Sequence, residues 1–261
     1  MTDSEIPQST YRLQFNRAFT FADAIQVIPY LAELGISHVY ASPYLRARPG
    51  SLHGYDIVDH HQINPEIGTP QEYERFVAVL HEHGLGQILD IVPNHMGIMG
   101  GDNAWWLDVL ENGEASAYAD FFDIDWYPLK GELQGKVLVP VLGDQYGTVL
   151  DRGELKLTFD QTAGELSIVY FQHRFPIDPR EYPRILGKNL GELEDRLGAQ
   201  NQELLELESL ITAFEHLPSK EEASGEKRAE RVRDKEIHKR RLASLCSGSL
   251  AVSEFLERAV G

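Results

Sequence analysis

The N-terminal third of the sequence alternates strand-like and helix-like segments, and this alternation is the feature that most limits the folds open to the chain. Apolar and β-branched runs predict strands at residues 10–15, 36–41 and 86–92. Thr20 and Thr69 each precede an acidic residue three positions on, which predicts capped helix starts, and Gly35 and Gly84 predict the helix ends. Nearly continuous apolar strands that alternate with helices are typical of a parallel sheet covered by helices.

The remaining sequence does not show this alternation of strand-like and helix-like segments. Residues 155–159 and 166–170 alternate with period two on either side of turn residues 160–164, which predicts a hairpin within a small β-rich insertion that spans residues 97–186. Residues 187–261 carry leucines at helical spacing, and 219–226 form an exposed break before a charged helix whose charges are read as a solvated face. The expected organisation is therefore three β/α units in 1–96, followed by the insertion and a helical region.

Composition narrows the class of function. Asp plus Glu total 41 against 24 Lys plus Arg, and the net charge of −17 argues against a nucleic-acid partner. Neither a leader peptide nor a run of eighteen apolar residues is evident, so neither export nor a membrane is expected. Cys246 is the only cysteine and is read as a buried apolar side chain, which fits a cytoplasmic location.

Polar side chains gather where the second and third predicted strands end. The candidate substrate-binding residues are Tyr44, His53, Tyr55 and Asp56 after the second strand, and Asp90, Asn94 and His95 at the third, with Asp90 inside the strand. The carboxyl ends of parallel strands meet at one edge, so these groups are expected to share a pocket. An aromatic face with hydrogen-bonding groups suits a sugar. Taken singly, each cluster also fits a local role as a turn or strand terminator.

No metal site and no cofactor is expected. His60 and His61 lie near Asp59, but adjacent histidines in an extended chain do not face one ion as an i, i+4 pair on a helix does.

The segment Asp90-Ile91-Val92-Pro93-Asn94-His95 resembles the first sequence signature of the α-amylase superfamily, and Tyr55-Asp56 is similar to the Tyr-Asp pair upstream of it. The resemblance implies an α/β fold in which residues 1–96 supply strands 1–3 of a (β/α)8 TIM barrel. It also implies that His95 donates to the glucose at subsite −1 and that Tyr55 stacks beneath that ring. Asp56 and Asp90 would hold the site's arginine and backbone, and Asn94 would support the loop. In calcium-dependent amylases the asparagine that matches Asn94 binds the ion; no convincing set of partner oxygens is evident in this sequence, so calcium binding stays open and is not favoured.

Within that superfamily the chain is most similar to the maltooligosyltrehalose synthases. The similarity lies in residues 9–15, 42–44, 53–56, 103–113 and 121–126, extends over essentially the whole chain, and is weakest from about residue 186 onward. It implies an intramolecular transglycosylation that turns the reducing-end α-1,4 bond of a malto-oligosaccharide into an α,α-1,1 bond. Because the anomeric configuration is retained in this bond change, the reaction requires a carboxylate nucleophile and a carboxyl acid/base.

No segment of this chain resembles the family's Gly-x-Arg-x-Asp-His nucleophile setting. Three strands also cannot close a barrel, and the third would present an open edge. We therefore expect that this chain holds no catalytic residue and is inactive as a fragment. The nucleophile and the acid/base are expected to lie beyond Gly261, on a second polypeptide that carries the rest of the barrel. Three alternatives stay open: an α-glucan hydrolase, a non-catalytic carbohydrate-binding fragment, and an aldolase-like barrel, although the last needs a strand lysine that these strands lack.

Overall fold

The computed structural model describes residues 6–221 and 224–261. The chain divides into two compact units, Met1–Ala104 and Trp105–Gly261. Residues 1–5, on which part of the expectation of no leader rests, lie outside the described residues, as do residues 222–223 of the predicted break.

The first unit holds a parallel sheet, a small antiparallel ribbon and two helices. Its elements are β1 (Thr10–Leu13), α1 (Phe21–Glu33), β2 (His38–Ala41), β3 (Leu45–Ala47), β4 (Ile57–Ile63), α2 (Pro70–Glu82) and β5 (Gly86–Leu89). The parallel sheet has the order β1-β2-β5, and β3 pairs antiparallel with β4 outside it. This mixed α/β arrangement is consistent with part of a (β/α) barrel.

Both helices of this unit start at the predicted capping boxes. The Thr20 hydroxyl accepts a hydrogen bond from the Asp23 N–H and the Thr69 hydroxyl accepts one from the Glu72 N–H, while each acidic side chain bonds back to its cap. A glycine with positive φ lies just beyond each helix, as predicted. The caps fix where the helices begin, and thereby where the loops that follow the strands must end.

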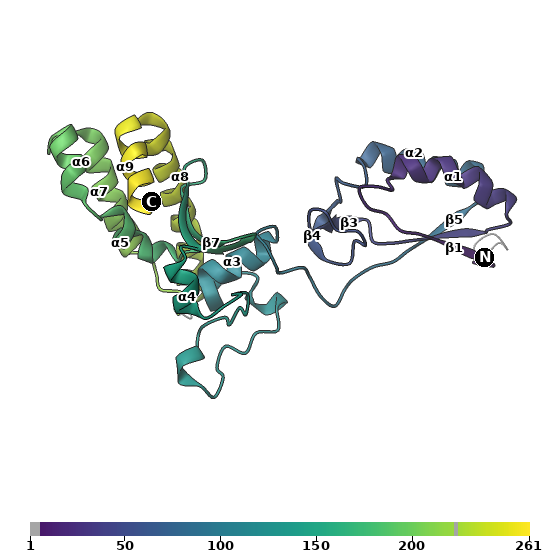
Figure 1. The fold of residues 1–261 in the computed structure, drawn as a ribbon, viewed down its shortest axis with the longest axis horizontal. Coiled ribbons are helices and arrows are strands. Elements are labelled where there is room, and N and C mark those ends of the chain that lie inside the picture. Colours follow the sequence, from purple (N-terminus) through teal and green to yellow (C-terminus); the bar gives the residue numbers. More distant parts are fainter. Residues whose placement is uncertain (1–5, 222–223) are drawn as a thin grey trace. The chain divides into compact units, whose positions relative to one another are not determined.

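The two helices cover one face of the parallel sheet (Figure 1). The core beneath them is built from Leu13, Val39 and Ala41 of the strands, Phe21, Ala24, Ile28 and Leu31 of α1, and Phe76 and Leu80 of α2. Because side chains alternate across a strand, Arg12 and Tyr40, which are in register, belong to the opposite face. That face is the one that bears polar side chains.

The third strand is shorter than predicted. It ends at Leu89, and Asp90 is therefore just past the strand rather than inside it. The Asp90 N–H still bonds to the Ala41 carbonyl at 3.0 Å. Pro93, which has no N–H to donate, comes three residues later and is poorly suited to a continued ladder.

Among its described residues, the second unit combines a three-stranded antiparallel sheet with seven α-helices and the short 3-10 helices η2 (Gly113–Ala115), η3 (Ala119–Phe121), η4 (Gly131–Leu133) and η5 (Pro179–Glu181). Its elements are α3 (Ala104–Asn112), α4 (Tyr146–Asp151), β6 (Leu155–Asp160), β7 (Glu165–Tyr170), β8 (His173–Pro176), α5 (Tyr182–Leu186), α6 (Leu190–Leu197), α7 (Gln202–Glu215), α8 (Gly225–Gly248) and α9 (Leu250–Val260). The strand order is β6-β7-β8. The β6–β7 hairpin lies at the position that the sequence predicts, and β8 is an addition to it.

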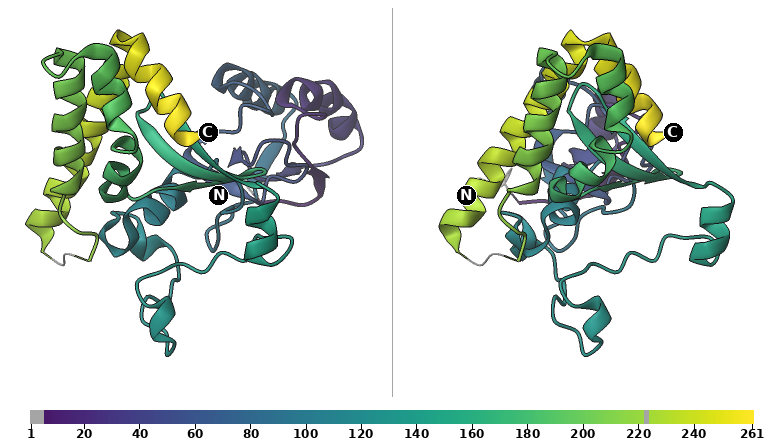
Figure 2. Two further views of the ribbon diagram at one scale, coloured as in Figure 1. Left: turned by 60° about the vertical axis from the view of Figure 1, so that its left-hand side comes forward. Right: turned by 90° about the vertical axis from the view of Figure 1, so that its left-hand side faces the viewer.

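The hairpin and the helices of this unit share one core. Leu166 of β7 packs in a cluster with Tyr182, Leu186, Leu193, Leu204, Leu207, Leu210, Phe214, Leu242, Val252, Phe255 and Leu256 from α5 to α9. Figure 2 shows these helices gathered beside the hairpin. The predicted boundary near residue 186 thus falls within one packed unit, and the three-part division stays a prediction.

A buried charge cluster joins α3 to α8. Glu111 is 5% exposed, and Lys235 and Lys239 are each 3% exposed. The Lys235 Nζ lies 2.7 Å from Glu111 and 3.1 Å from Asp108, while Lys239 contacts Glu111 and lies 3.1 Å from Glu165. Part of the charged face of α8 is therefore buried and paired, which corrects the expectation that it is a solvated face.

Cys246 is buried, as expected, and burial raises the pKa of its thiol to about 11. Within the described part of the chain, no helix is both long enough and apolar enough to cross a membrane.

Candidate functional site

The candidate site lies where β1, β2 and β5 of the first unit end, around the carboxylate of Asp90. Three side chains donate hydrogen bonds to its Oδ2 atom: Tyr55 at 2.6 Å, Tyr40 at 2.9 Å and Arg12 at 3.2 Å. The bond from Tyr55, with those from Tyr40 and Arg12, holds the pKa of Asp90 below its ordinary value of 3.8. Asp90 is therefore an anion that orients its neighbours.

A pocket of about 270 Å³ opens beside Asp90 and its three hydrogen-bond donors. It is lined by Arg48, His53, Tyr55, Asp56, His95, Met96, Gly97, Ile98 and Met99. Four of the seven predicted binding residues line it together, from two loops whose lining residues are 39 or more positions apart in the sequence, while Asp90 adjoins it through Tyr55. A phenol ring, two imidazoles and apolar side chains give it the mixed lining that a sugar ring requires.

The loop before β4 is held by its own polar groups. The Ser51 hydroxyl donates to Asp56 and accepts from the Gly54 N–H at 3.1 Å. Nδ1 of His53 accepts from the Tyr55 N–H at 3.0 Å. Gly54 has φ +77°, and a Cβ there would lie 3.0 Å from the Pro43 carbonyl oxygen. Only glycine satisfies both conditions without strain, and this fixes the direction in which Tyr55 leaves the turn.

His95 and Asn94 follow β5 and are both exposed. Nδ1 of His95 lies 3.0 Å from Oδ1 of Asn94. An amide oxygen only accepts, so Nδ1 carries the proton in this pair and Nε2 is left to bond a ligand. Nε2 then accepts from a sugar hydroxyl when the ring is neutral and donates when it is protonated. Asn94 does not line the pocket, but it sets the state of a residue that does.

Tyr44 is the predicted binding residue that the structure places elsewhere. It is 4% exposed and packs edge-on against Phe15 and Phe21, with ring centroids 5.3 Å and 5.1 Å away. Its hydroxyl lies 3.2 Å from Gln87 Oε1. A side chain enclosed in this way offers no surface to a sugar, so the assignment of Tyr44 to the binding site is corrected to a core role.

Comparison with known proteins decides the family. Residues 20–171, more than half of the chain, match the alpha amylase catalytic domain. The chain belongs to the alpha-amylase family.

Similar proteins of this family narrow the likeness. A Mycobacterium tuberculosis protein that carries the name maltooligosyl trehalose synthase is 42% identical over 172 residues, which is 60% of this chain and 22% of the relative. The solved maltooligosyltrehalose synthase from Arthrobacter ramosus has a TM-score of 0.56 and 43% identity, over 66% of this chain and 21% of that one. A maltogenic alpha-amylase of Bacillus acidopullulyticus is 38% identical over 105 residues, 40% of this chain and 17% of the relative. The chain spans about a fifth of the length of these synthases.

Besides Arg48 and Met96–Met99 of the pocket lining, sequence reasoning missed two residues that support the candidate site, Arg12 and Tyr40. Both lie in strands and were read only as parts of strands. A signal was present, because an arginine within a strand of a barrel that is covered on both faces needs a partner inside it. Its partner, Asp90, lies 78 positions away, which no local pattern indicates.

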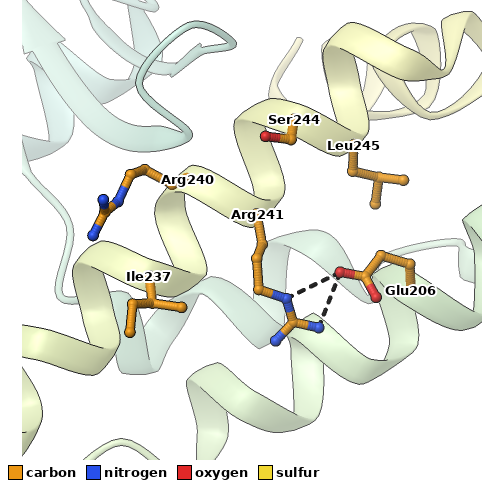
Figure 3. Close-up of a pocket in the computed structure, with 6 residues that line it drawn as sticks. All are labelled: Glu206, Ile237, Arg240, Arg241, Ser244 and Leu245. Carbon is orange, nitrogen blue, oxygen red and sulfur yellow. Dashed lines mark hydrogen bonds and ion pairs between the residues drawn. The ribbon is translucent and has the colours of Figure 1, made fainter.

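A larger groove of about 540 Å³ lies between α7 and α8 in the second unit (Figure 3). Its lining residues are Glu206, Ile237, Arg240, Arg241, Ser244 and Leu245. Nε of Arg241 donates to Glu206 at 3.0 Å, and Nε of Arg240 donates to the Glu236 carbonyl at 3.1 Å. None of the lining residues is aromatic, so the pocket beside Tyr55 is the better candidate for an alpha-amylase family site.

Within residues 6–221 and 224–261, no three His, Cys, Asp or Glu side chains are grouped closely enough to hold a metal ion. His60 and His61 are consecutive residues of β4, where neighbouring side chains point to opposite faces.

Proposed function

We propose that this chain forms the substrate-binding N-terminal part of an enzyme that converts the reducing-end α-1,4 bond of a malto-oligosaccharide into an α,α-1,1 bond. The observation that carries the proposal is the convergence of His53, Tyr55, Asp56 and His95 on one pocket beside Asp90. The synthase names of its relatives support the choice of reaction. The single cysteine supports a cytoplasmic location.

Each pocket residue has a role that its contacts support. Tyr55 offers its ring to the face of a glucosyl unit while its hydroxyl stays tied to Asp90. His95 bonds a glucosyl hydroxyl through Nε2, with Asn94 holding its other nitrogen. Asp56 stabilises the loop through Ser51, and His53 extends the polar wall.

The catalytic carboxylates are proposed to lie beyond Gly261, with the remaining barrel strands on a continuing chain or a second polypeptide. A retaining pair needs two carboxyl groups about 5–5.5 Å apart, one of them free to attack. Asp90 is engaged by three donors and Asp56 by Ser51, so neither is a free nucleophile.

The proposed reaction has two displacements. The nucleophile attacks C1 of the penultimate glucose, and the acid protonates O4 of the reducing-end glucose as the C1–O4 bond breaks. That glucose stays bound and turns, and its anomeric hydroxyl attacks the glycosyl–enzyme while the base removes its proton. The configuration at C1 is retained, and the product has no reducing end.

Counting reducing ends tests the proposal. A complete enzyme containing this sequence is incubated with maltohexaose, and reducing ends and sugar chain lengths are followed together. We expect reducing ends to fall while the number of glucosyl units per molecule is unchanged. A rise in reducing ends with shorter products would instead indicate the hydrolase that the likeness to a maltogenic alpha-amylase supports as second candidate. Binding with no change in either count would indicate a non-catalytic carbohydrate-binding protein.

A further inference from the structure

β1 and the residues that follow it carry polar side chains at alternate positions, and all of them reach the loop of residues 51–56 before β4. Arg12 donates to the Tyr55 hydroxyl at 2.6 Å and to Asp90 at 3.2 Å. Gln14 and Asn16 both donate side-chain N–H groups to the Leu52 carbonyl, at 3.1 Å and 3.2 Å. This segment therefore meets the loop at two separate points, one of them the Tyr55 hydroxyl.

The Arg12 guanidinium is itself fixed. Its central carbon lies 4.6 Å from the centre of the Tyr40 ring, a distance at which a cation is attracted to the ring face. Tyr40 also donates its hydroxyl to Asp90 at 2.9 Å. Arg12 and Tyr40 are register partners in adjacent parallel strands, so the strand pairing sets their relative positions.

The planar guanidinium of Arg12 holds the Tyr55 hydroxyl and the Asp90 carboxylate at fixed positions relative to each other. One arm ends on Tyr55, which borders the pocket, and the other ends on Asp90, which Tyr55 also contacts at 2.6 Å. These contacts form a closed triangle of hydrogen bonds. Removing Arg12 leaves the Tyr55 hydroxyl with Asp90 as its one remaining partner among those described, and frees the ring to tilt at the pocket wall.

We propose that Arg12 is a positioning residue for the glucosyl-binding site: its guanidinium, seated on Tyr40, locks the Tyr55 ring and the Asp90 carboxylate in the arrangement that receives the sugar. Arg12 does not line the pocket and acts through Tyr55. This inference rests on the proposed function, because it assigns a role within the same site.

Two measurements on matched variants test it. In the 261-residue chain, the pKa of the Asp90 carboxyl is followed by ¹³C NMR, assigned with Asp90→Asn. Arg12→Met should move that pKa upward toward the ordinary 3.8, since it removes a cation and loosens Tyr55. In the complete enzyme, the same variant should lower kcat by about 10- to 100-fold, the scale of a small misplacement of binding groups.

The controls separate positioning from structure and from charge. Arg17→Met, at an exposed arginine five residues along the same segment, should leave both readings unchanged. Arg12→Lys keeps a positive charge but cannot bond Tyr55 and Asp90 through two separate N–H arms. The pKa of Asp90 should therefore stay close to its wild-type value, and kcat should lie between those of Arg12→Met and the wild type. If Arg12→Met does not fold, Arg12→Lys gives both readings, with smaller changes in the same direction.

A shifted Asp90 pKa with unchanged kcat, or a lowered kcat with an unshifted pKa, would overturn the positioning role. The ratio of kcat between Arg12→Met and the wild type is informative whether the enzyme isomerises or hydrolyses its substrate, because both reactions use the same glucosyl-binding site. A wild-type enzyme without any turnover of α-glucans would overturn the proposed function, while the NMR reading on the chain would still report on the Arg12 triangle.

Discussion

His95 extends from the segment after β5, where it is exposed and hydrogen-bonded to Asn94 rather than packed in a core. In the complete enzyme, His95→Ala should lower kcat/KM for maltohexaose by about 10²- to 10³-fold, because a hydrogen bond that tightens in the transition state is lost. Thermal stability should be unchanged. The control is His83→Ala, an exposed histidine at the end of α2. Normal kinetics of His95→Ala would contradict a role in subsite −1.

Gly54 offers a second test at the scale of one residue. Gly54 and Gly35 have φ of +77° and +79°, but a Cβ at Gly54 would meet the Pro43 carbonyl at 3.0 Å, whereas Gly35 faces open space. Gly35→Ala should lower the free energy of unfolding of the first unit by about 1–2 kcal/mol from backbone strain alone. Gly54→Ala should cost about 1–3 kcal/mol more from the close contact. Calorimetry measures both, and equal losses would show that the approach to Pro43 is unimportant.

Among the elements of the second unit, α3 and α8 are joined by the buried Glu111, Lys235 and Lys239. Burial alone raises the pKa of Glu111, but Lys239 and Lys235 together hold it below its ordinary value of 4.5. Burial likewise lowers the pKa of each lysine, and Glu111 reverses that effect. The stabilisation from Glu111 is therefore complete above pH 4.5 and is lost as the pH falls through its lowered folded pKa.

Glu111→Gln should lower the free energy of unfolding of this unit by about 3–5 kcal/mol at neutral pH, because two buried lysines lose their shared counter-ion. The matched control is Glu230→Gln, which breaks an exposed pair with Lys227 and should cost under about 1 kcal/mol. All three tryptophans lie between residues 105 and 126, so their fluorescence during urea unfolding reports on the second unit alone. Equal losses for the two variants would refute the importance of the buried cluster.

Elements set by local sequence were predictable, and those set by distant contacts were not. The capping boxes at Thr20 and Thr69 act over three residues, so the helix starts follow from the sequence. The burial of Tyr44 depends on Phe15 and Phe21, and the role of Arg12 depends on a carboxylate 78 positions away. The candidate pocket was found because its residues follow strands, and its supporting side chains were missed because they lie within them.

At the scale of the whole molecule, β5 pairs only with β2 among the described strands. Its other edge leaves backbone N–H and C=O groups available, as an added parallel strand requires. The additional strands and the catalytic carboxylates belong together in the proposal, because barrel chemistry takes place at strand ends.

The purified 261-residue chain should therefore bind maltohexaose but neither isomerise nor hydrolyse it. Calorimetric titration checks binding, and the reducing-end count over many hours checks turnover. His95→Ala serves as the control for binding at the predicted site. Turnover by the chain alone, with its purity established by mass spectrometry, would show that the nucleophile is already present.

The hydrogen bonds on Asp90 also determine when the pocket forms. They join it to Tyr55, Tyr40 and Arg12 across 35, 50 and 78 positions of sequence. Closing loops of that length carries an entropy penalty that local helix turns avoid. In the nascent chain, α1 and α2 can begin to form from their own caps, while the candidate pocket has to wait until β5 has emerged and docked beside β2. The candidate pocket is thus expected to be the last feature that the first unit acquires as it folds.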